Sequence, residues 1–165
     1  MNELNKSRTP KGALIDKLGG LVVRYQDATQ RYDDAVGEVY GLGPAERLCL
    51  SFLWDGPKSA SAIARHTRLT PAAVTALIDR LEKRGFVSRR PDPDDRRKVM
   101  VEAGAETLRV TEDAYAPLQV AGEKALARYT EAELRLFARM LEDSLAIQEE
   151  MTQAFLARHS KNERR

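Results

Sequence analysis

The stretch 91-PDPDDRRKV-99 gathers more charge than any other short segment of the chain. Three aspartates lie within four residues, and three cationic residues follow them directly. Guanidinium groups bind phosphate through paired hydrogen bonds, so arginines on a projecting loop can contact a polyanion. The alternative is a solvated loop whose charges only keep it in water. Because aspartates would repel an anionic target, their role decides between these interpretations.

No constellation typical of catalysis or metal binding accompanies this stretch. The sequence lacks the GxSxG, GxxxxGK[ST], GxGxxG and CxxC motifs. Its two histidines, His66 and His159, are far apart, and Cys49 is its only cysteine. We therefore expect no enzyme, no metal site and no cofactor. Cys49 is interpreted either as a small buried hydrophobe or as a redox sensor.

The composition favours a globular, largely helical protein. Of 165 residues, 42% are hydrophobic and 32% are charged, which allows a buried core beneath solvated helix faces. Between Lys58 and Glu102, eleven Lys and Arg stand against six Asp and Glu, so this segment carries +5 and the rest −3. A basic centre between acidic flanks predicts one anion-facing segment. With no signal peptide and no apolar run of about 20 residues, we expect a cytoplasmic protein without a membrane partner.

Two helices are expected before the basic segment. Apolar residues recur every three or four positions from Lys11 to Glu38, which predicts an amphipathic helix. Gly41 and Gly43 end this helix. Pro44 suits the first turn of the next one, a short and strongly apolar helix over 44–56.

A helix-turn-helix is predicted next. Ser59 can cap a two-turn helix, and about three residues connect it to a longer helix. Thr70 supplies a hydroxyl N-cap for that second helix, Pro71 fits its first position, and Gly85 closes it. Two helices in this arrangement have the shape of a helix-turn-helix.

A hairpin follows, and its loop is the charged stretch. The short runs 86–90 and 98–102 are predicted strands, the second with clear alternation. A connection over 91–97 is longer than a tight hairpin loop and should project. Asp92 and Pro93 suit the first two positions of a type I turn. Helix, helix and hairpin is the order of a winged helix.

Helices are expected again after Gly104. Pro117 should kink or break the segment around it, because proline removes a helical hydrogen bond. Thr130 and Glu133 form a capping box before a last helix over 131–159. That helix is apolar on two sides, which indicates two partners, one of which could be another subunit. The expected fold class is mainly α with a small β-hairpin wing.

The segment from about Ser59 to Glu102 resembles the DNA-binding domain of the MarR family of bacterial winged helix-turn-helix transcription regulators. The matching residues are 70-TPAAVTALID-79 and 81-LEKRGFVSRRPDPDDRRKVMV-101, in which Asp95-Arg96-Arg97 corresponds to the Asp-x-Arg of the family's wing. After the wing the sequence departs from the family pattern. Ala103-Gly104 replace the usual Leu-Thr, and Thr107 replaces a glycine. This departure concerns the start of the next helix and not the fold.

The resemblance implies a DNA-binding regulator, a ligand-responsive repressor that acts as a homodimer on a pseudo-palindromic operator and associates with the nucleoid when bound. Residues 44–103 would form the winged helix-turn-helix domain. Residues 11–43 and 104–159 would form a helical dimerisation region, with flexible tails at 1–10 and 160–165. The candidate DNA-binding residues are Lys58, Arg65, Arg68, Thr70, Ala72, Ala73, Thr75, Ala76, Arg80, Arg84, Arg96 and Arg97.

The content of the predicted recognition helix indicates weak direct readout. Alanine can only touch thymine methyl groups, and threonine adds one hydrogen bond. We therefore expect phosphates, DNA shape and the wing to contribute more. Arg96 and Arg97 are the minor-groove candidates. The aspartates then divide by role: Asp92 and Asp94 form the turn, and Asp95 orients the guanidinium of Arg97.

Three large residues are candidates for an effector pocket. Tyr25, Tyr32 and Trp54 could line a site for a small aromatic or phenolic molecule, as in related proteins, or they belong to core or dimer packing. The alternative function is a winged helix used for protein contacts without specific DNA binding.

Overall fold

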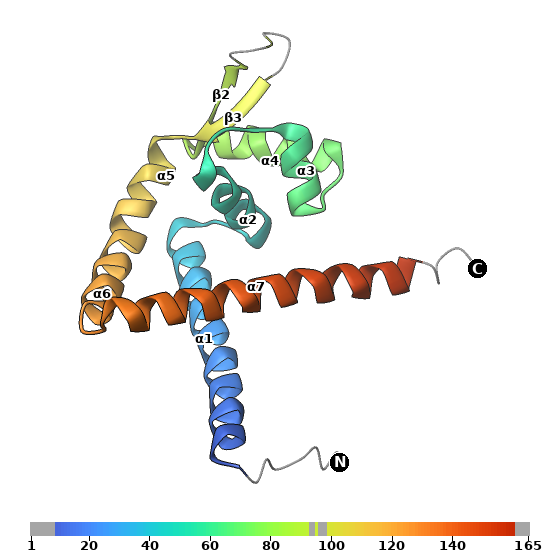
Figure 1. The fold of residues 1–165 in the computed structure, drawn as a ribbon. Coiled ribbons are helices and arrows are strands. Elements are labelled where there is room, and N and C mark those ends of the chain that lie inside the picture. Colours follow the sequence, from blue (N-terminus) through green and yellow to red (C-terminus); the bar gives the residue numbers. More distant parts are fainter. Residues whose placement is uncertain (1–8, 93–94, 96–98, 161–165) are drawn as a thin grey trace. The chain divides into compact units, whose positions relative to one another are not determined.

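The computed structural model describes residues 9–92, 95 and 99–160, and the chain divides after Tyr115 into two compact units (Figure 1). The elements of the first unit are α1 (Pro10–Tyr40), α2 (Pro44–Phe52), the 3-10 turn η1 (Leu53–Asp55), β1 (Lys58–Ser59), α3 (Ala60–Thr67), α4 (Pro71–Lys83), β2 (Val87–Pro91), β3 (Val99–Ala103), α5 (Ala105–Val110) and the π-helical turn η2 (Thr111–Tyr115). The second unit contains α6 (Ala116–Leu126) and α7 (Glu131–Ser160). The predicted fold class, mainly α with a small β wing, is confirmed.

Local caps determine where α1 begins and ends. The Thr9 hydroxyl accepts a hydrogen bond from the backbone N–H of Gly12 at 3.1 Å, so the helix begins at Pro10 rather than Lys11. At the other end Gly41 has φ 61°, a left-handed conformation that glycine adopts without strain. The backbone N–H of Leu42 then bonds the carbonyl of Gly37 at 2.8 Å, which closes the last turn.

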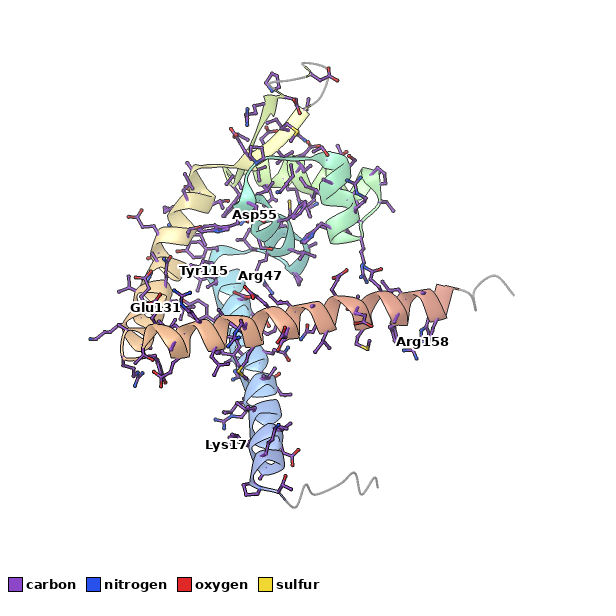
Figure 2. The ribbon with its side chains drawn as sticks, in the orientation of Figure 1. Lys17, Arg47, Asp55, Tyr115, Glu131 and Arg158 are labelled. Atoms are coloured by element: carbon purple, nitrogen blue, oxygen red, sulfur yellow. The ribbon has the colours of Figure 1, made fainter. Side chains whose placement is uncertain are left out.

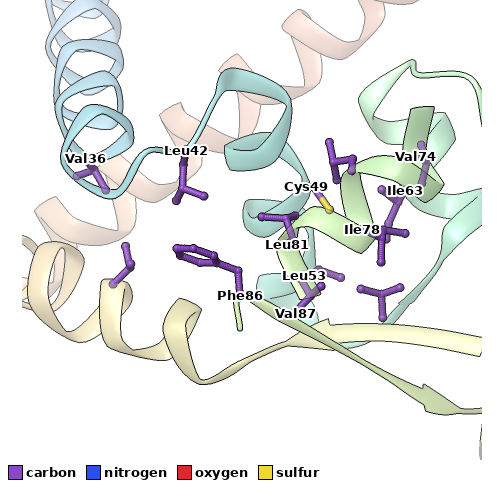
Figure 3. Close-up of a cluster of buried hydrophobic side chains, with 13 residues drawn as sticks. Val36, Leu42, Cys49, Leu53, Ile63, Val74, Ile78, Leu81, Phe86 and Val87 are labelled. Atoms are coloured by element: carbon purple, nitrogen blue, oxygen red, sulfur yellow. The ribbon is translucent and has the colours of Figure 1, made fainter. Parts of the chain in front are cut away.

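The helix-turn-helix forms as predicted, and the apolar stripe of α4 fills the core. The hydroxyls of Ser59 and Thr70 cap α3 and α4. The core gathers side chains from α1, α2, α3, α4, β2, β3 and α5, and α4 alone supplies four of them (Figure 3). The four are Val74, Leu77, Ile78 and Leu81, each at most 1% exposed. Burial of this stripe fixes which side of α4 remains in solvent.

The wing is a three-stranded sheet, not only a hairpin. β2 and β3 pair antiparallel in the register Arg89 opposite Val101 and Pro91 opposite Val99. The two-residue strand β1, which the sequence did not predict, pairs with the other edge of β3 and gives the order β1-β3-β2. β1 connects the sheet directly to the start of α3.

The departure from the family pattern after the wing has a steric explanation. Gly104 is the N-cap of α5, and a Cβ built on it would lie 2.4 Å from the carbonyl oxygen of Gly85. The hydroxyl of Thr107, one turn later, donates to the carbonyl of Phe86 at 2.6 Å. The start of this helix is therefore held by close backbone packing and by a side chain from within the helix.

The helical segment around Pro117 is irregular, as expected. Proline has no N–H for the carbonyl four residues before it, which is that of Asp113. The turn η2, which contains Asp113, is wound as a π-helix, and the boundary between the two units follows Tyr115. Proline therefore accounts for the change of winding at this position.

The second unit is two helices joined by a short turn. Thr130 and Glu133 form the predicted capping box: the Glu133 carboxylate accepts from the Thr130 N–H at 2.8 Å, and the Thr130 hydroxyl accepts from the Glu133 N–H at 3.3 Å. The hydrogen bonds that the Glu133 carboxylate accepts from the backbone N–H and the hydroxyl of Thr130 lower the pKa of Glu133. Large apolar side chains on α7, among them Phe137 and Leu145, are exposed. Within the described ranges, no helix is long and apolar enough to cross a membrane.

Candidate nucleic-acid interface

The solvent face of α4 is made of small side chains. With the apolar stripe buried, Ala72, Thr75 and Ala76 are exposed in succession along the helix, and Ala73 is half-buried. The Thr75 hydroxyl bonds back to the carbonyl of Pro71 at 3.1 Å. Short side chains let the backbone of a helix approach a surface closely. They also offer few hydrogen-bonding groups for recognition.

The turn between α3 and α4 carries a cation on a strained backbone. Arg68 has φ 56°, and among the described residues it is the one non-glycine with a positive φ. Glycine is the usual residue in this conformation, since a Cβ there is unfavourable. The turn therefore keeps an exposed arginine where glycine would be more stable.

Three other predicted cations lie on β1, α3 and α4 of the same unit. Lys58 lies on β1 with its ammonium 5.0 Å from the centre of the Phe52 ring, whose face also stacks on His66. Arg65 is exposed on α3. Arg80 is exposed on α4, and its Nε lies 3.5 Å from a carboxylate oxygen of Glu46. Arg65 and Arg80 are thus accessible, whereas Lys58 is half-buried.

The guanidinium of Arg84 has partners within the protein that the sequence did not predict. Its guanidinium donates to the carbonyl oxygens of Tyr40 at 2.7 Å and Gly41 at 3.0 Å, and it packs over the Phe86 ring at 4.8 Å. Those carbonyls end α1, where backbone acceptors lack helical partners and a positive charge is favourable. Arg84 therefore caps α1, and its contact with phosphate stays a prediction.

Arg89 ties the wing to α4. From β2 its guanidinium bonds the carboxylate of Asp79 at 2.5 Å and also that of Glu82, and both acids lie on α4. The hydrogen bond that Arg89 donates to Asp79 is the main cause of the raised pKa of Arg89. This bridge offsets part of the negative charge of the two acids, so Asp79 presents less of it to an approaching anion.

The base of the wing loop shows part of the predicted turn. The Asp92 carboxylate accepts from the Asp95 backbone N–H at 3.2 Å, in keeping with a turn-forming role for Asp92. On the adjoining strands Arg90 pairs with Glu102 at 2.7 Å. Asp94, Arg96 and Arg97 lie outside the described residues, and so does the predicted contact between Asp95 and Arg97.

The first unit also contains a pocket of about 630 Å³. Its walls come from α1, α2, η1, α5 and η2, and it has a mainly apolar lining with a few polar groups, the usual character of a small-molecule site. Arg47, Asp55 and Tyr115, three of the lining residues, are labelled in Figure 2. The other lining residues are Gln30, Asp33, Val36, Leu42, Pro44, Leu48, Leu50, Ser51, Trp54, Thr107, Val110 and Thr111.

Of the three predicted pocket residues, Trp54 is among those that line this pocket, where it is 71% exposed. Tyr25 lies on α1 and is 75% exposed, with no part in this lining. Tyr32 is also absent from it. Its ring packs edge-on against Tyr115 at 6.0 Å, and its hydroxyl donates to the carbonyl of Ala114 at 2.5 Å.

Tyrosine hydroxyls attach η2 to α1 beside the pocket. Tyr115 donates to Asp33 at 3.1 Å, and Tyr40 donates to Asp113. Burial, followed by the charge of Asp33, raises the pKa of Tyr115 to about 12. The hydrogen bond to Asp113 raises the pKa of Tyr40. Both phenols therefore remain protonated donors near neutral pH.

Cys49 lies in the core. It is 0% exposed, and burial, with a smaller contribution from the charge of Glu46, raises the pKa of its thiol to about 11. Reactive cysteines are accessible and have a lowered pKa, so this environment favours the structural interpretation over redox sensing. Among the described residues, no cluster of His, Cys, Asp and Glu could hold a metal ion.

Sequence comparisons match the chain to a family of regulators. The sequence model of the MarR family matches residues 45–99. YcgE of Bacillus subtilis, an uncharacterized HTH-type transcriptional regulator, is 33% identical over 123 residues, which cover 74% of this chain and 80% of that protein. Rv2887 of Mycobacterium tuberculosis, an HTH-type transcriptional repressor, is 32% identical over 126 residues, which cover 76% of this chain and 91% of that protein.

A solved structure supports the same fold. A MarR family protein from Bacillus stearothermophilus superposes with a TM-score of 0.60 and 21% identity, and the match covers 92% of this chain and 99% of that one. The fold is thus a winged helix-turn-helix with additional helices on both sides in the sequence. The chain belongs to the MarR family.

Two residues of the pocket, Arg47 and Tyr115, were not predicted from the sequence. Arg47, which lines the pocket, donates to the carbonyl of Leu42 at 3.2 Å and pairs with Asp34. Tyr115 lines the same pocket from η2, a turn that the sequence pattern did not distinguish from the helices on either side. For Arg47 a signal did exist, since Gly37 lies ten residues earlier and leaves the space that the guanidinium fills.

Proposed function

We propose that the chain is a sequence-specific double-stranded DNA-binding transcription regulator, a repressor that acts as a homodimer on a pseudo-palindromic operator. The observation that carries this proposal is the solvent face of α4, whose small side chains are exposed on the same unit as exposed cations on α3, α4 and the turn between them. The description of Rv2887 as a repressor supports it. Such a regulator would act in the cytoplasm, on the nucleoid.

In this proposal α4 enters the major groove, with Thr70, Ala72, Ala73, Thr75 and Ala76 toward the bases. Methyl groups on alanine and threonine favour thymine but discriminate weakly, so most affinity comes from phosphates and DNA shape. Lys58, Arg65, Arg68 and Arg80 bind phosphates. Arg96 and Arg97 stay predicted as minor-groove contacts, and Asp95 as the residue that orients Arg97.

Dimerisation is supported by apolar side chains that a single chain leaves in water. On α1, Leu14, Leu18 and Leu21 recur at helical spacing and are 39–56% exposed. Patches of this kind on a helix are typical of protein interfaces. We propose that residues 11–43 and 104–159 form the dimerisation region and residues 44–103 the DNA-binding domain.

Ligand response is the second component of the proposal. The pocket holds an exposed indole from Trp54, the Arg47 guanidinium and the Tyr115 hydroxyl, which suits a small aromatic or phenolic molecule with an acidic group. A ligand there would contact both α1 and the elements that lead into the winged helix. A ligand that binds this pocket more tightly in the free protein than in the DNA-bound protein would therefore shift the equilibrium away from the DNA-bound form.

The decisive experiment is selection of bound sites from a random double-stranded pool, followed by binding measurements against excess competitor DNA. A pseudo-palindromic consensus with half-site centres roughly 34–36 Å apart supports the proposal. Absence of any enriched site would favour the alternative, a winged helix that contacts only proteins. The selected complex is then titrated with phenol and benzoate derivatives while emission of Trp54, the single tryptophan, is recorded.

Readout by α4 is tested by substituting each operator base pair in turn. We expect most major-groove substitutions to cost less than about 2 kcal/mol, and substitutions that widen the minor groove to reduce affinity comparably. Larger costs at the major-groove positions, with no effect of minor-groove width, contradict weak direct readout.

A further inference from the structure

We propose that Arg84 and Glu46 form a junction that fixes the tilt of the winged helix against α1, and that this junction sets the half-site spacing which the protein accepts. The inference rests on the proposed function, because spacing has a meaning only for a dimer on a two-part operator. Arg84 is then a positioning residue and not a contact to DNA.

The first part of the junction joins the end of α4 to the end of α1. Arg84 is the C-cap residue of α4, and its two terminal nitrogens bond separate carbonyls, those of Tyr40 and Gly41. A planar guanidinium that bonds two acceptors restricts orientation as well as distance. Gly41 and Tyr40 lie 43 and 44 positions before Arg84 in the sequence, so the contact connects two separate elements.

The second part adds the start of α2. Glu46 is only 8% exposed, and its carboxylate accepts from the backbone N–H of Gly43 at 2.9 Å. The same carboxylate lies 3.5 Å from Arg80 and 3.7 Å from Arg84, which are one turn apart on α4. A buried charge requires such partners, so Glu46 links the start of α2 to the end of α4, and Arg84 extends this link to the end of α1.

A small change of tilt at this junction displaces the far end of α4 by a distance comparable to the rise of a base pair in DNA. α4 has 13 residues and is about 20 Å long. A rotation of about 10° about its C-terminal end moves its N-terminal end by roughly 3.4 Å, the rise of one base pair. If α1 belongs to the dimer interface, the tilt of α4 against α1 determines the distance between the two recognition helices.

The test uses a series of operators in which the selected half-sites are separated by two fewer to two more base pairs. Dissociation constants are measured for the wild-type protein, for Arg84→Met, which keeps the aliphatic stem, and for Arg84→Lys. We expect the wild type to prefer one spacing by about tenfold or more over its neighbours, comparable to the cost of a mismatch. Arg84→Met should reduce that preference to about threefold with non-specific affinity unchanged, and Arg84→Lys should lie between.

Lys83→Met is the matched control, because Lys83 is the exposed neighbouring cation at the end of the same helix. It should leave the spacing profile unchanged. If Arg84→Met is not folded by circular dichroism, Glu46→Gln makes the same test, since glutamine retains an acceptor for Gly43 and removes the charge.

Three outcomes overturn the inference. A variant that is less stable but keeps the wild-type spacing profile shows a structural role only. Uniformly weaker binding with a salt slope lower by about one shows that Arg84 contacts phosphate after all. A wild-type protein without any spacing optimum overturns the proposed function together with this inference, whereas an optimum that Arg84→Met retains overturns the inference alone.

Discussion

At the scale of single residues, Arg68 combines a backbone conformation that lowers stability with a proposed role in binding. A left-handed backbone costs an L-residue about 1 kcal/mol, and strained conformations concentrate at functional sites. Arg68 is exposed in the turn before α4, next to the proposed groove-binding face. An arginine kept at such a position is consistent with a contact that glycine could not make.

We predict that Arg68→Gly raises the free energy of unfolding by about 0.5–1 kcal/mol and weakens binding to DNA of any sequence. Chemical denaturation measures the first effect, and binding at several salt concentrations measures the second, as a slope lower by about one. The control Arg68→Ala removes the charge but keeps the strain, so it should weaken binding without added stability. Unchanged affinity in both variants would falsify the phosphate contact.

Several arginines look alike in the sequence, and only their distant partners distinguish them. Arg68 and Arg84 both follow helices in the basic segment, so each was a reasonable phosphate candidate. The carbonyls that engage Arg84 lie more than 40 residues earlier in the chain, and no local pattern encodes that approach. Arg68 could be placed from the sequence because the turn itself is local.

At the scale of elements, α4 has two threonines with different roles. Thr70 stabilises the helix, and Thr75 is proposed to contact DNA. The Thr70 hydroxyl caps the helix by accepting from the Ala73 N–H at 3.3 Å, whereas the Thr75 hydroxyl only bonds a carbonyl of its own helix. Loss of an N-cap costs about 1 kcal/mol, while alanine is at least as good as threonine within a helix.

We therefore predict that Thr70→Ala lowers the free energy of unfolding by about 1 kcal/mol. Thr75→Ala should leave stability unchanged or slightly higher and should weaken binding only to operators with its preferred base. Urea denaturation together with the base-substitution series distinguishes the two. Equal losses of stability in both variants would contradict this division of roles.

Elements with local signals were predictable, and elements made by tertiary contact were not. The caps at Thr70 and Thr130 are encoded within four residues, and both helices begin where the sequence indicated. β1 has two residues and exists only because β3 pairs with it some 40 residues later. The π-helical winding of η2 was also missed, although the proline that explains it was identified.

At the scale of the whole molecule, the proposed dimer would supply a partner for the long helices. An isolated helix gains little stability from its own hydrogen bonds, so α1 and α7 should depend on packing of their apolar sides. The apolar side of α1 could be predicted from its spacing. The fact that no described segment of the first unit buries it could not, because a periodic pattern does not say which surface covers a helix.

We predict that the double variant Leu18→Lys, Leu21→Lys is monomeric, with a mass near 18.5 kDa by sedimentation, and has lost operator binding. Two charges on the apolar side of α1 should prevent a second copy from packing there. The matched control Asp16→Lys, Asp27→Lys adds lysines to the opposite side of the same helix and should remain dimeric. A dimer formed by the leucine variant would exclude this face of α1 as the interface.

The burial of Cys49 has a practical consequence for spectroscopy. It is the single cysteine of the chain, and in the folded protein its protonated thiol is out of reach of maleimide and methanethiosulfonate reagents. A cysteine introduced on an exposed position such as Ser61 can therefore carry a spin label or fluorophore while Cys49 stays in place. If two copies associate as proposed, the distance between their labels can then be followed, with and without operator, in a protein whose core is unaltered.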